Sequence, residues 1–204
     1  LSDSTMVPHA SRLLSQTCVK VVEGQASDIE FEKRLDVSED EYLTMISQKT
    51  AALISTALEL GTLAAGVIDT TRNKIAALGK AMGIAYQIRD DMLGTWGDPR
   101  ITGKPVGEDL RRKKNTFPVV YTMSKARDRD RDILRQIYSQ ETVSDQDVAI
   151  ALEIMDSVGA RSYAQDLASE HCERAISALS TVELDHRAMK DFREIANFLL
   201  IREH

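Results

Sequence analysis

Two adjacent aspartates, Asp90 and Asp91, carry the clearest chemical signal in the sequence. With Lys80, Gly83 and Gln87 they recur at helical spacing on one face of a segment whose other faces are apolar. A helix that is apolar nearly all round lies inside a protein, where neighbouring carboxylates need a cation to compensate them. Magnesium suits this role because it combines a few carboxylate oxygens with water and phosphate oxygens. The plainer alternative is an exposed aspartate pair at the end of a helix.

Lys49 stands where the pattern of the preceding helical segment calls for an apolar residue. It follows Ile46 and precedes Leu53 by one turn each, and a lysine seldom lies on such a stripe unless it serves something. Its ammonium group could reach an anion in a cavity, and Thr50 beside it could donate a hydroxyl group. The alternative is a lysine whose stem is covered and whose ammonium reaches water, beside a threonine that bonds its own backbone.

A segment rich in glycine and proline, GTWGDPRITGKPVG at residues 94–107, follows the aspartate pair. An irregular connection of this length is unusual in a compact domain, so we expect it to be functional. Exposed backbone N–H groups and the ammonium groups of Lys104 and Lys114 suit a diphosphate, although the pattern is not that of a P-loop. The basic run at residues 111–114 has a second interpretation, a nucleic-acid or nuclear-targeting patch, which the acidic net charge disfavours.

Helices with apolar stripes must position these residues. The spacing of apolar residues predicts helices over residues 7–32, 39–66, 71–93, 145–158, 161–179 and 185–202, and another that begins near residue 115. Ser38 and Glu41 form the capping-box pattern that starts the second of these helices. Its predicted stripe consists of Tyr42, Met45, Ile46, Leu53, Thr56, Ala57 and Leu60. The alternating charges of residues 125–135 indicate a solvated helix face or a turn between helices.

The composition agrees with one all-α domain over residues 1–204. A share of 43% hydrophobic and 28% charged residues is typical of a globular protein, and only 5% are aromatic, which favours helices over sheets. The net charge of -6 argues against a nucleic-acid partner, and the lack of a long apolar run argues against a transmembrane segment. Cys18 and Cys172 lack disulfide or metal spacing, so we expect a reducing, cytoplasmic location.

Three segments resemble, in order, signature motifs of the trans-isoprenyl diphosphate synthases. They are EGQASDIEFE at residues 23–32, YLTMISQKTAALI at residues 42–54 and YQIRDDMLGTWGDPRITGKPVGEDLRRKKNTFP at residues 86–118. The resemblance implies an antiparallel helical bundle of the isoprenoid synthase type around a central cavity, assembled as a homodimer. It also implies a magnesium-dependent prenyltransferase that condenses isopentenyl diphosphate with an allylic diphosphate into a linear polyprenyl diphosphate, for example of geranylgeranyl length.

The resemblance further implies roles for matching positions. Asp90 and Asp91 match the carboxylates that bind magnesium, and Asp90 is expected to be catalytic. The donors that match diphosphate-binding positions are Lys49, Thr50, Gln87, Lys104 and Lys114, with Lys49 and Lys104 catalytic as well. Gln25 and Asp28 match a helix that faces the cavity. In the family chemistry, metal and lysine stabilise the departing pyrophosphate, and the double bond of isopentenyl diphosphate attacks an allylic cation shielded from water.

The sequence departs from the family pattern in two places. Gly94 stands where the family's second motif, DDxxD, has its third aspartate, which we expect to weaken one metal contact; Asp98 could replace it through water or loop closure. The family's first aspartate-rich motif has no counterpart before Asp90, so half of the metal site is missing from the sequence. Because the chain begins at Leu1, we expect it to be the C-terminal part of a longer enzyme whose N-terminal helices are missing.

Two other functions remain open. A class I terpene cyclase uses the same helical framework, and the altered DDMLG motif is a mild indication of one. A non-catalytic subunit that forms a dimer with, or regulates, a prenyl synthase would use the bundle for packing alone. Lys49, Lys104 and the aspartate pair argue against such a subunit, because a purely structural bundle gains nothing from buried like charges.

Overall fold

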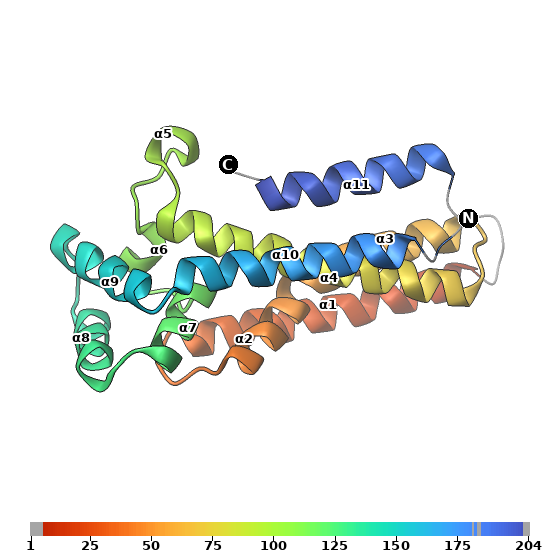
Figure 1. The fold of residues 1–204 in the computed structure, drawn as a ribbon. Helices are drawn as coiled ribbons and strands as arrows, with labels where there is room; N and C mark the ends of the chain where they lie inside the picture. Colours follow the sequence, from red (N-terminus) through yellow and green to blue (C-terminus); the bar gives the residue numbers. More distant parts are fainter. Residues whose placement is uncertain (1–5, 181, 183–184, 202–204) are drawn as a thin grey trace.

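The computed structural model describes residues 6–180, 182 and 185–201, and every regular element in these ranges is a helix (Figure 1). In chain order these are α1 Met6–Phe31, α2 Glu39–Ile46, the π-helix η1 Ser47–Ala51, α3 Ala52–Ala64, α4 Asp69–Trp96, α5 Pro99–Thr102, α6 Glu108–Arg111, α7 Phe117–Lys125, α8 Asp128–Ser139, α9 Asp145–Ser157, α10 Ala160–Leu179 and α11 His186–Ile201. The all-α prediction is therefore confirmed. No helix in the described ranges combines the length and apolarity needed to cross a bilayer.

The long helix α4 lies at the centre of the bundle. It packs against both α3 and α10, while α1 packs against α3, and α11 packs against α10 and α4. The short helices α6 to α9 gather at one end of the long ones, on the left in Figure 1, which is also the end that α4 reaches with its C-terminal turns. The acidic turn of α4 is thus placed where several short elements converge.

Most helix boundaries follow the apolar pattern. The helices predicted over residues 7–32, 145–158 and 161–179 are confirmed to within one residue at each end. The capping box is present, because the Ser38 N–H donates to Glu41 Oε2 at 2.9 Å and the Ser38 hydroxyl accepts from the Glu41 N–H at 3.2 Å. The last predicted helix is confirmed from His186 onward, and residue 202 lies outside the described residues. Helix α4 extends three residues beyond its predicted end, to Trp96, so Gly94 is helical.

The helix predicted over residues 39–66 is helical from Glu39 to Ala64, but its regular stripe is interrupted. Residues Ser47–Ala51 form a π-helical turn between α2 and α3, and the second of these helices ends at Ala64. A π turn holds an extra residue, which rotates the following side chains around the axis. Of the predicted stripe, Tyr42, Met45, Ile46 and Thr56 are buried, whereas Leu53 and Ala57 are exposed and Ala52 and Leu63 are buried instead. Lys49 therefore lies in an irregular turn and not on a continuous apolar stripe.

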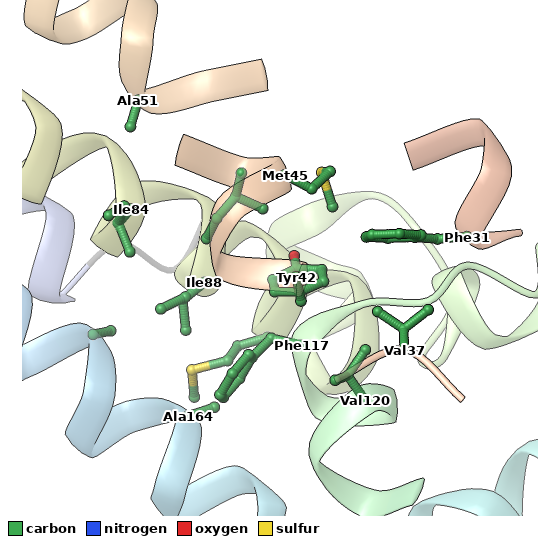
Figure 2. Close-up of a cluster of buried hydrophobic side chains, with 13 residues drawn as sticks. Phe31, Val37, Tyr42, Met45, Ala51, Ile84, Ile88, Phe117, Val120 and Ala164 are labelled. Carbon is green, nitrogen blue, oxygen red and sulfur yellow. The ribbon is translucent and has the colours of Figure 1, made fainter. Parts of the chain in front are cut away.

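A buried cluster joins α2, α4, α7 and α10 beneath the acidic turn (Figure 2). Its centre is formed by Tyr42, Phe117 and Ile88, and the first two rings lie 5.8 Å apart between centroids in a tilted arrangement. Full burial of side chains of this size stabilises the fold by roughly 1.5–3 kcal/mol each. This cluster fixes the C-terminal half of α4 relative to the elements that face it.

Candidate active site

A cavity lies between η1, α4 and the segment that precedes α7. It is lined by Asp28, Tyr42, Met45, Ile46, Lys49, Gln87, Asp90, Asp91, Lys114, Asn115 and Thr116. The structure thus brings the unusual lysine of one helix and the aspartate pair of another to the same cavity. Gln25, which the sequence also assigned to a helix facing the cavity, is exposed on α1 and is not among these lining residues.

Two glycines allow η1 to carry Lys49 into this cavity. A Cβ atom at Gly24 of α1 would lie 2.4 Å from the Lys49 backbone nitrogen, and one at Gly83 of α4 would lie 2.5 Å from Ala51 Cα. Both positions therefore exclude a side chain, and the π turn touches both neighbouring backbones. The Lys49 ammonium group pairs with Asp28 Oδ2 at 2.5 Å, and each side chain keeps 31% of its surface exposed. Because both side chains are partly exposed to solvent, the ion pair is weak enough to break when another anion binds Lys49.

The predicted polar face of α4 is divided between different surroundings. Gly83 meets the backbone of η1, and Lys80 lines a separate cavity between α1 and α3. Only Gln87, Asp90 and Asp91 line the cavity that holds Lys49. The helical period placed these residues on one side correctly, but it contained no information about which neighbour each of them meets.

The buried carboxylate of Asp91 holds several elements of the site together through hydrogen bonds. It is 5% exposed, and its Oδ2 accepts hydrogen bonds from the Tyr42 hydroxyl and, at 2.8 Å, from the Phe117 N–H. Its Oδ1 accepts from Gln87 Nε2 at 3.1 Å, and the Thr50 hydroxyl donates to Gln87 Oε1 at 2.7 Å. The three hydrogen bonds to Asp91 occupy three of the about four acceptor positions of its carboxylate. Asp91, predicted as a metal ligand, is held mainly by protein donors.

Burial determines the protonation of this network. It raises the pKa of Asp91 to about 7, against the opposing effect of the Phe117, Tyr42 and Gln87 donors. Burial and then the charge of Asp91 raise the pKa of Tyr42 well above its ordinary value, so the phenol keeps its proton and remains a donor. Tyr42 therefore remains a donor to Asp91, whose carboxyl group is partly protonated near pH 7.

Asp90 connects the first cavity to a second one. It is exposed and lines both cavities, as does Lys114. The remaining residues of the second cavity are Leu93, Gly94, Ile101, Thr102, Lys104 and Asp109. Lys104 therefore lies on the loop side of Asp90, away from Lys49. The two predicted catalytic lysines approach Asp90 from opposite elements, η1 and the loop after α5.

Asp109, for which no role was predicted, lines this second cavity. It is 9% exposed and its Oδ1 is 3.1 Å from the Lys114 ammonium nitrogen. Burial lowers the pKa of Lys114, but the contact with Asp109 and the charges of Asp91 and Asp90 outweigh it and raise the pKa. Lys114 thus remains cationic beside the acids. Asp98, expected as a substitute for the missing third aspartate, caps α5, pairs with Arg100 and lines a different cavity.

Thr116 is a second residue that the sequence left without a role. It is 4% exposed, and its hydroxyl has no hydrogen-bond partner among the described residues, although it lies in the wall of the first cavity. An unsatisfied buried hydroxyl costs roughly 1–3 kcal/mol. A ligand oxygen that reached this hydroxyl from the cavity would remove the cost, so Thr116 is a candidate contact for a polar occupant.

The donor set of the two cavities fits magnesium. It consists of carboxylate and hydroxyl oxygens, and no group of three or more acidic, histidine or cysteine residues in the described ranges converges as a ready metal cage. Magnesium needs no such cage, since it takes one or two carboxylates and completes its octahedron with water and substrate phosphate. The lysines at the same cavities supply the donors that a phosphate requires.

Comparisons with known proteins cover nearly the whole chain. The model of the family described as polyprenyl synthetase matches residues 1–155. A short chain isoprenyl diphosphate synthase of Methanothermobacter thermautotrophicus is 40% identical, over 99% of this chain and 61% of that protein.

Two solved structures have the same fold. A polyprenyl synthetase from Streptomyces coelicolor superposes with a TM-score of 0.91 at 31% identity, over 97% of this chain and 60% of that one. A geranylgeranyl pyrophosphate synthase from Corynebacterium glutamicum, complexed with isoprenyl diphosphate and magnesium, gives a TM-score of 0.89 at 27% identity, over 98% and 57%. The chain thus spans about three fifths of the length of the proteins it matches.

Proposed function

Because this chain belongs to the polyprenyl synthetase family, we propose that it forms the allylic-diphosphate half of a magnesium-dependent prenyltransferase. The reaction condenses isopentenyl diphosphate with an allylic diphosphate into a linear polyprenyl diphosphate. The observation that carries the proposal is the cavity shared by Lys49, Asp90 and Lys114, which combines a carboxylate for a metal with ammonium groups for a phosphate. The relative complexed with isoprenyl diphosphate and magnesium supports the same assignment.

The chain's own residues bind and orient the diphosphate. Lys49 exchanges its contact with Asp28 for a phosphate oxygen, while Lys104 and Lys114 approach from the loop side. Asp90, which lines both cavities, would hold magnesium, together with Asp91 in the first cavity. The metal supplies positive charge that stabilises the pyrophosphate as it leaves.

The second layer of the site keeps these groups in place. Gln87 gives one amide hydrogen to Asp91, which leaves its other hydrogen for the diphosphate, and Thr50 fixes the orientation of that amide. The buried cluster around Tyr42 and Phe117 (Figure 2), both of which donate to Asp91, gives this side of the cavity an apolar backing. Exclusion of water protects an allylic cation from hydrolysis.

We further propose that the enzyme is a homodimer located in the cytoplasm. The dimer follows from the family resemblance, and the location follows from two cysteines that form no disulfide, Cys18 exposed and Cys172 buried. Light scattering of the purified protein tests the dimer, and imaging of the tagged protein tests the location.

Product analysis tests the function itself. The complete protein is incubated with magnesium, isopentenyl diphosphate and allylic diphosphates of several lengths, and we expect a longer linear diphosphate. A cyclic hydrocarbon would instead identify a class I terpene cyclase, and the absence of turnover would favour the non-catalytic subunit. The 204-residue chain alone is expected to be inactive, since it lacks a first aspartate-rich motif.

A matched pair of variants tests the site. Asp90→Asn removes the proposed metal contact and should reduce turnover about 100-fold or more. Asp98→Asn makes the same chemical change at a residue that lines another cavity, and it should retain turnover. Equal activity of the two variants would contradict the assignment of Asp90.

A further inference from the structure

Gly94 and Asp109 compete for one space. A Cβ atom built on Gly94 would lie 1.8 Å from Asp109 Oδ2 and 2.5 Å from its Cγ, far closer than non-bonded atoms approach. Gly94 follows Asp90 by one helical turn on α4, so a carboxylate at position 94 would lie on the same face as Asp90. The carboxylate of Asp109, which comes from α6, fills the space that such a side chain would enter.

The path of the loop holds Asp109 in this place. Gly107 adopts a positive φ of 73°, and its N–H donates to the Thr95 carbonyl oxygen at 3.1 Å, which ties the start of α6 to α4. The next residue after Asp109, Leu110, is buried in a core cluster with α7 and α9. The Lys114 N–H donates to the Asp109 carbonyl oxygen at 2.9 Å. These contacts fix the backbone of Asp109 beside α4, and its carboxylate pairs with the Lys114 ammonium group.

Resting on the proposed function, we propose that Asp109 supplies a carboxylate to the magnesium and diphosphate site beside Asp90, in place of a residue at position 94. It lines the same cavity as Asp90, Lys104 and Lys114, the residues to which the proposal assigns metal and diphosphate. A carboxylate that is nearly buried beside other acids is costly unless a cation compensates it.

The unpartnered Thr116 hydroxyl is an independent indication that these walls receive a polar ligand. It is buried in the adjoining cavity, which shares Asp90 and Lys114 with the cavity of Asp109. A metal-bound water or a phosphate oxygen there would satisfy the hydroxyl while the metal contacts Asp90 and Asp109.

Lys114 compensates Asp109 while no metal is present. Its ammonium nitrogen lies 3.1 Å from Asp109 Oδ1. A divalent cation at Asp109 displaces this contact, because two cations compete for the same oxygen. The released ammonium group is then available for the diphosphate, so metal binding and diphosphate binding favour each other at this pair.

Metal binding tests the proposal without any turnover. Manganese, as a magnesium substitute, is titrated by electron paramagnetic resonance into the complete protein in the presence of inorganic pyrophosphate. Asp109→Asn should weaken manganese binding about 10-fold or more. Gly94→Ala, which forces Asp109 aside, should weaken binding similarly. The double change Gly94→Asp with Asp109→Gly returns the carboxylate to α4 and should restore affinity to within a factor of about three.

The outcomes separate this proposal from the proposed function. Asp109→Asn with wild-type affinity, or a double variant as weak as Asp109→Asn, would overturn the role of Asp109 while Asp90→Asn still abolished binding. Wild-type manganese binding by Asp90→Asn would instead remove the metal site of the proposed function. Far-ultraviolet circular dichroism of each variant confirms that the helices are intact, and the isosteric Asp109→Asn keeps the test decisive if the double variant does not fold.

Discussion

The Tyr42 hydroxyl donates a hydrogen bond to Asp91 Oδ2, and this bond joins α2 to the acidic turn of α4 across 49 positions of sequence. The Phe117 N–H, at the start of α7, donates to the same oxygen. Three helices therefore meet at one carboxylate oxygen in the wall of the cavity. The arrangement makes the geometry of the site dependent on a contact that bears no substrate.

Removing this hydroxyl should destabilise the fold. Tyr42→Phe keeps the ring in the buried cluster but leaves Asp91 with one donor fewer, so the free energy of unfolding should fall by about 1.5–3 kcal/mol. Tyr163→Phe removes an exposed hydroxyl that donates to Glu39 and should change stability by less than about 0.5 kcal/mol. Urea denaturation measures both free energies of unfolding. Equal losses would show that the buried hydrogen bond contributes no more to stability than the exposed one.

Lys49 and Lys80, which line different cavities, should behave differently when they are changed. Lys49→Gln removes an ammonium group from the candidate site and should weaken pyrophosphate binding about 10-fold or more, since charge-assisted contacts to phosphate are strong. Lys80→Gln makes the same change at a residue that lines a separate cavity. Calorimetric titration of pyrophosphate with magnesium should give wild-type affinity for the second variant. Comparable weakening of pyrophosphate binding in both variants would mean that Lys49 acts through the overall electrostatic field of the protein and not through a direct contact.

The Thr116 hydroxyl should cost stability and contribute to binding. Thr116→Val removes an unpartnered buried hydroxyl. The free energy of unfolding of the free protein should therefore stay the same or rise, by up to about 1–3 kcal/mol. Binding of magnesium pyrophosphate should weaken about 5-fold, since a net hydrogen bond contributes about 1 kcal/mol. Thr122→Val, at a buried threonine whose hydroxyl donates to the Pro118 carbonyl oxygen, should lower stability and leave binding unchanged. A loss of stability without a loss of affinity in Thr116→Val would exclude the ligand contact.

The close approach of η1 to α4 should depend on Gly83. Gly83→Ala places a methyl group 2.5 Å from Ala51 Cα, so the backbones must separate, which should cost about 1–3 kcal/mol. Gly61→Ala adds a methyl group in α3 with no heavy atom within 4 Å and should stabilise the protein by about 0.5–1 kcal/mol. Thermal unfolding distinguishes the two. Two stabilised variants would mean that the helices do not touch at Gly83.

Local signals in the sequence were sufficient for the long helices. The apolar period predicted α1, α9 and α10 to within one residue, and Ser38 with Glu41 predicted the start of α2, because these features depend on residues only three or four positions apart. The same period identified Gln87 and the aspartate pair as one polar face. It also placed Lys80 there, although the neighbours that decide its surroundings come from α1 and α3.

The rest depends on contacts between distant segments. The four-residue helices α5 and α6 carry no apolar period, and the position of Asp109 beside Gly94 follows from the Gly107 to Thr95 hydrogen bond and the burial of Leu110. A glycine in place of an aspartate indicated a loss at position 94. Only the path of the chain through space shows that another carboxylate fills the gap.

The π turn reconciles two demands that a regular helix could not meet together. The face of α2 is set by Tyr42 and Ile46 in the core, and the face of α3 is set by its contacts with α1 and α4. Deleting one residue between Ser47 and Ala51 would turn the following chain by about 100°. Either Lys49 would then no longer point into the cavity, or α3 would lose its contacts with α1 and α4, so insertions and deletions should be tolerated least at this point of the chain.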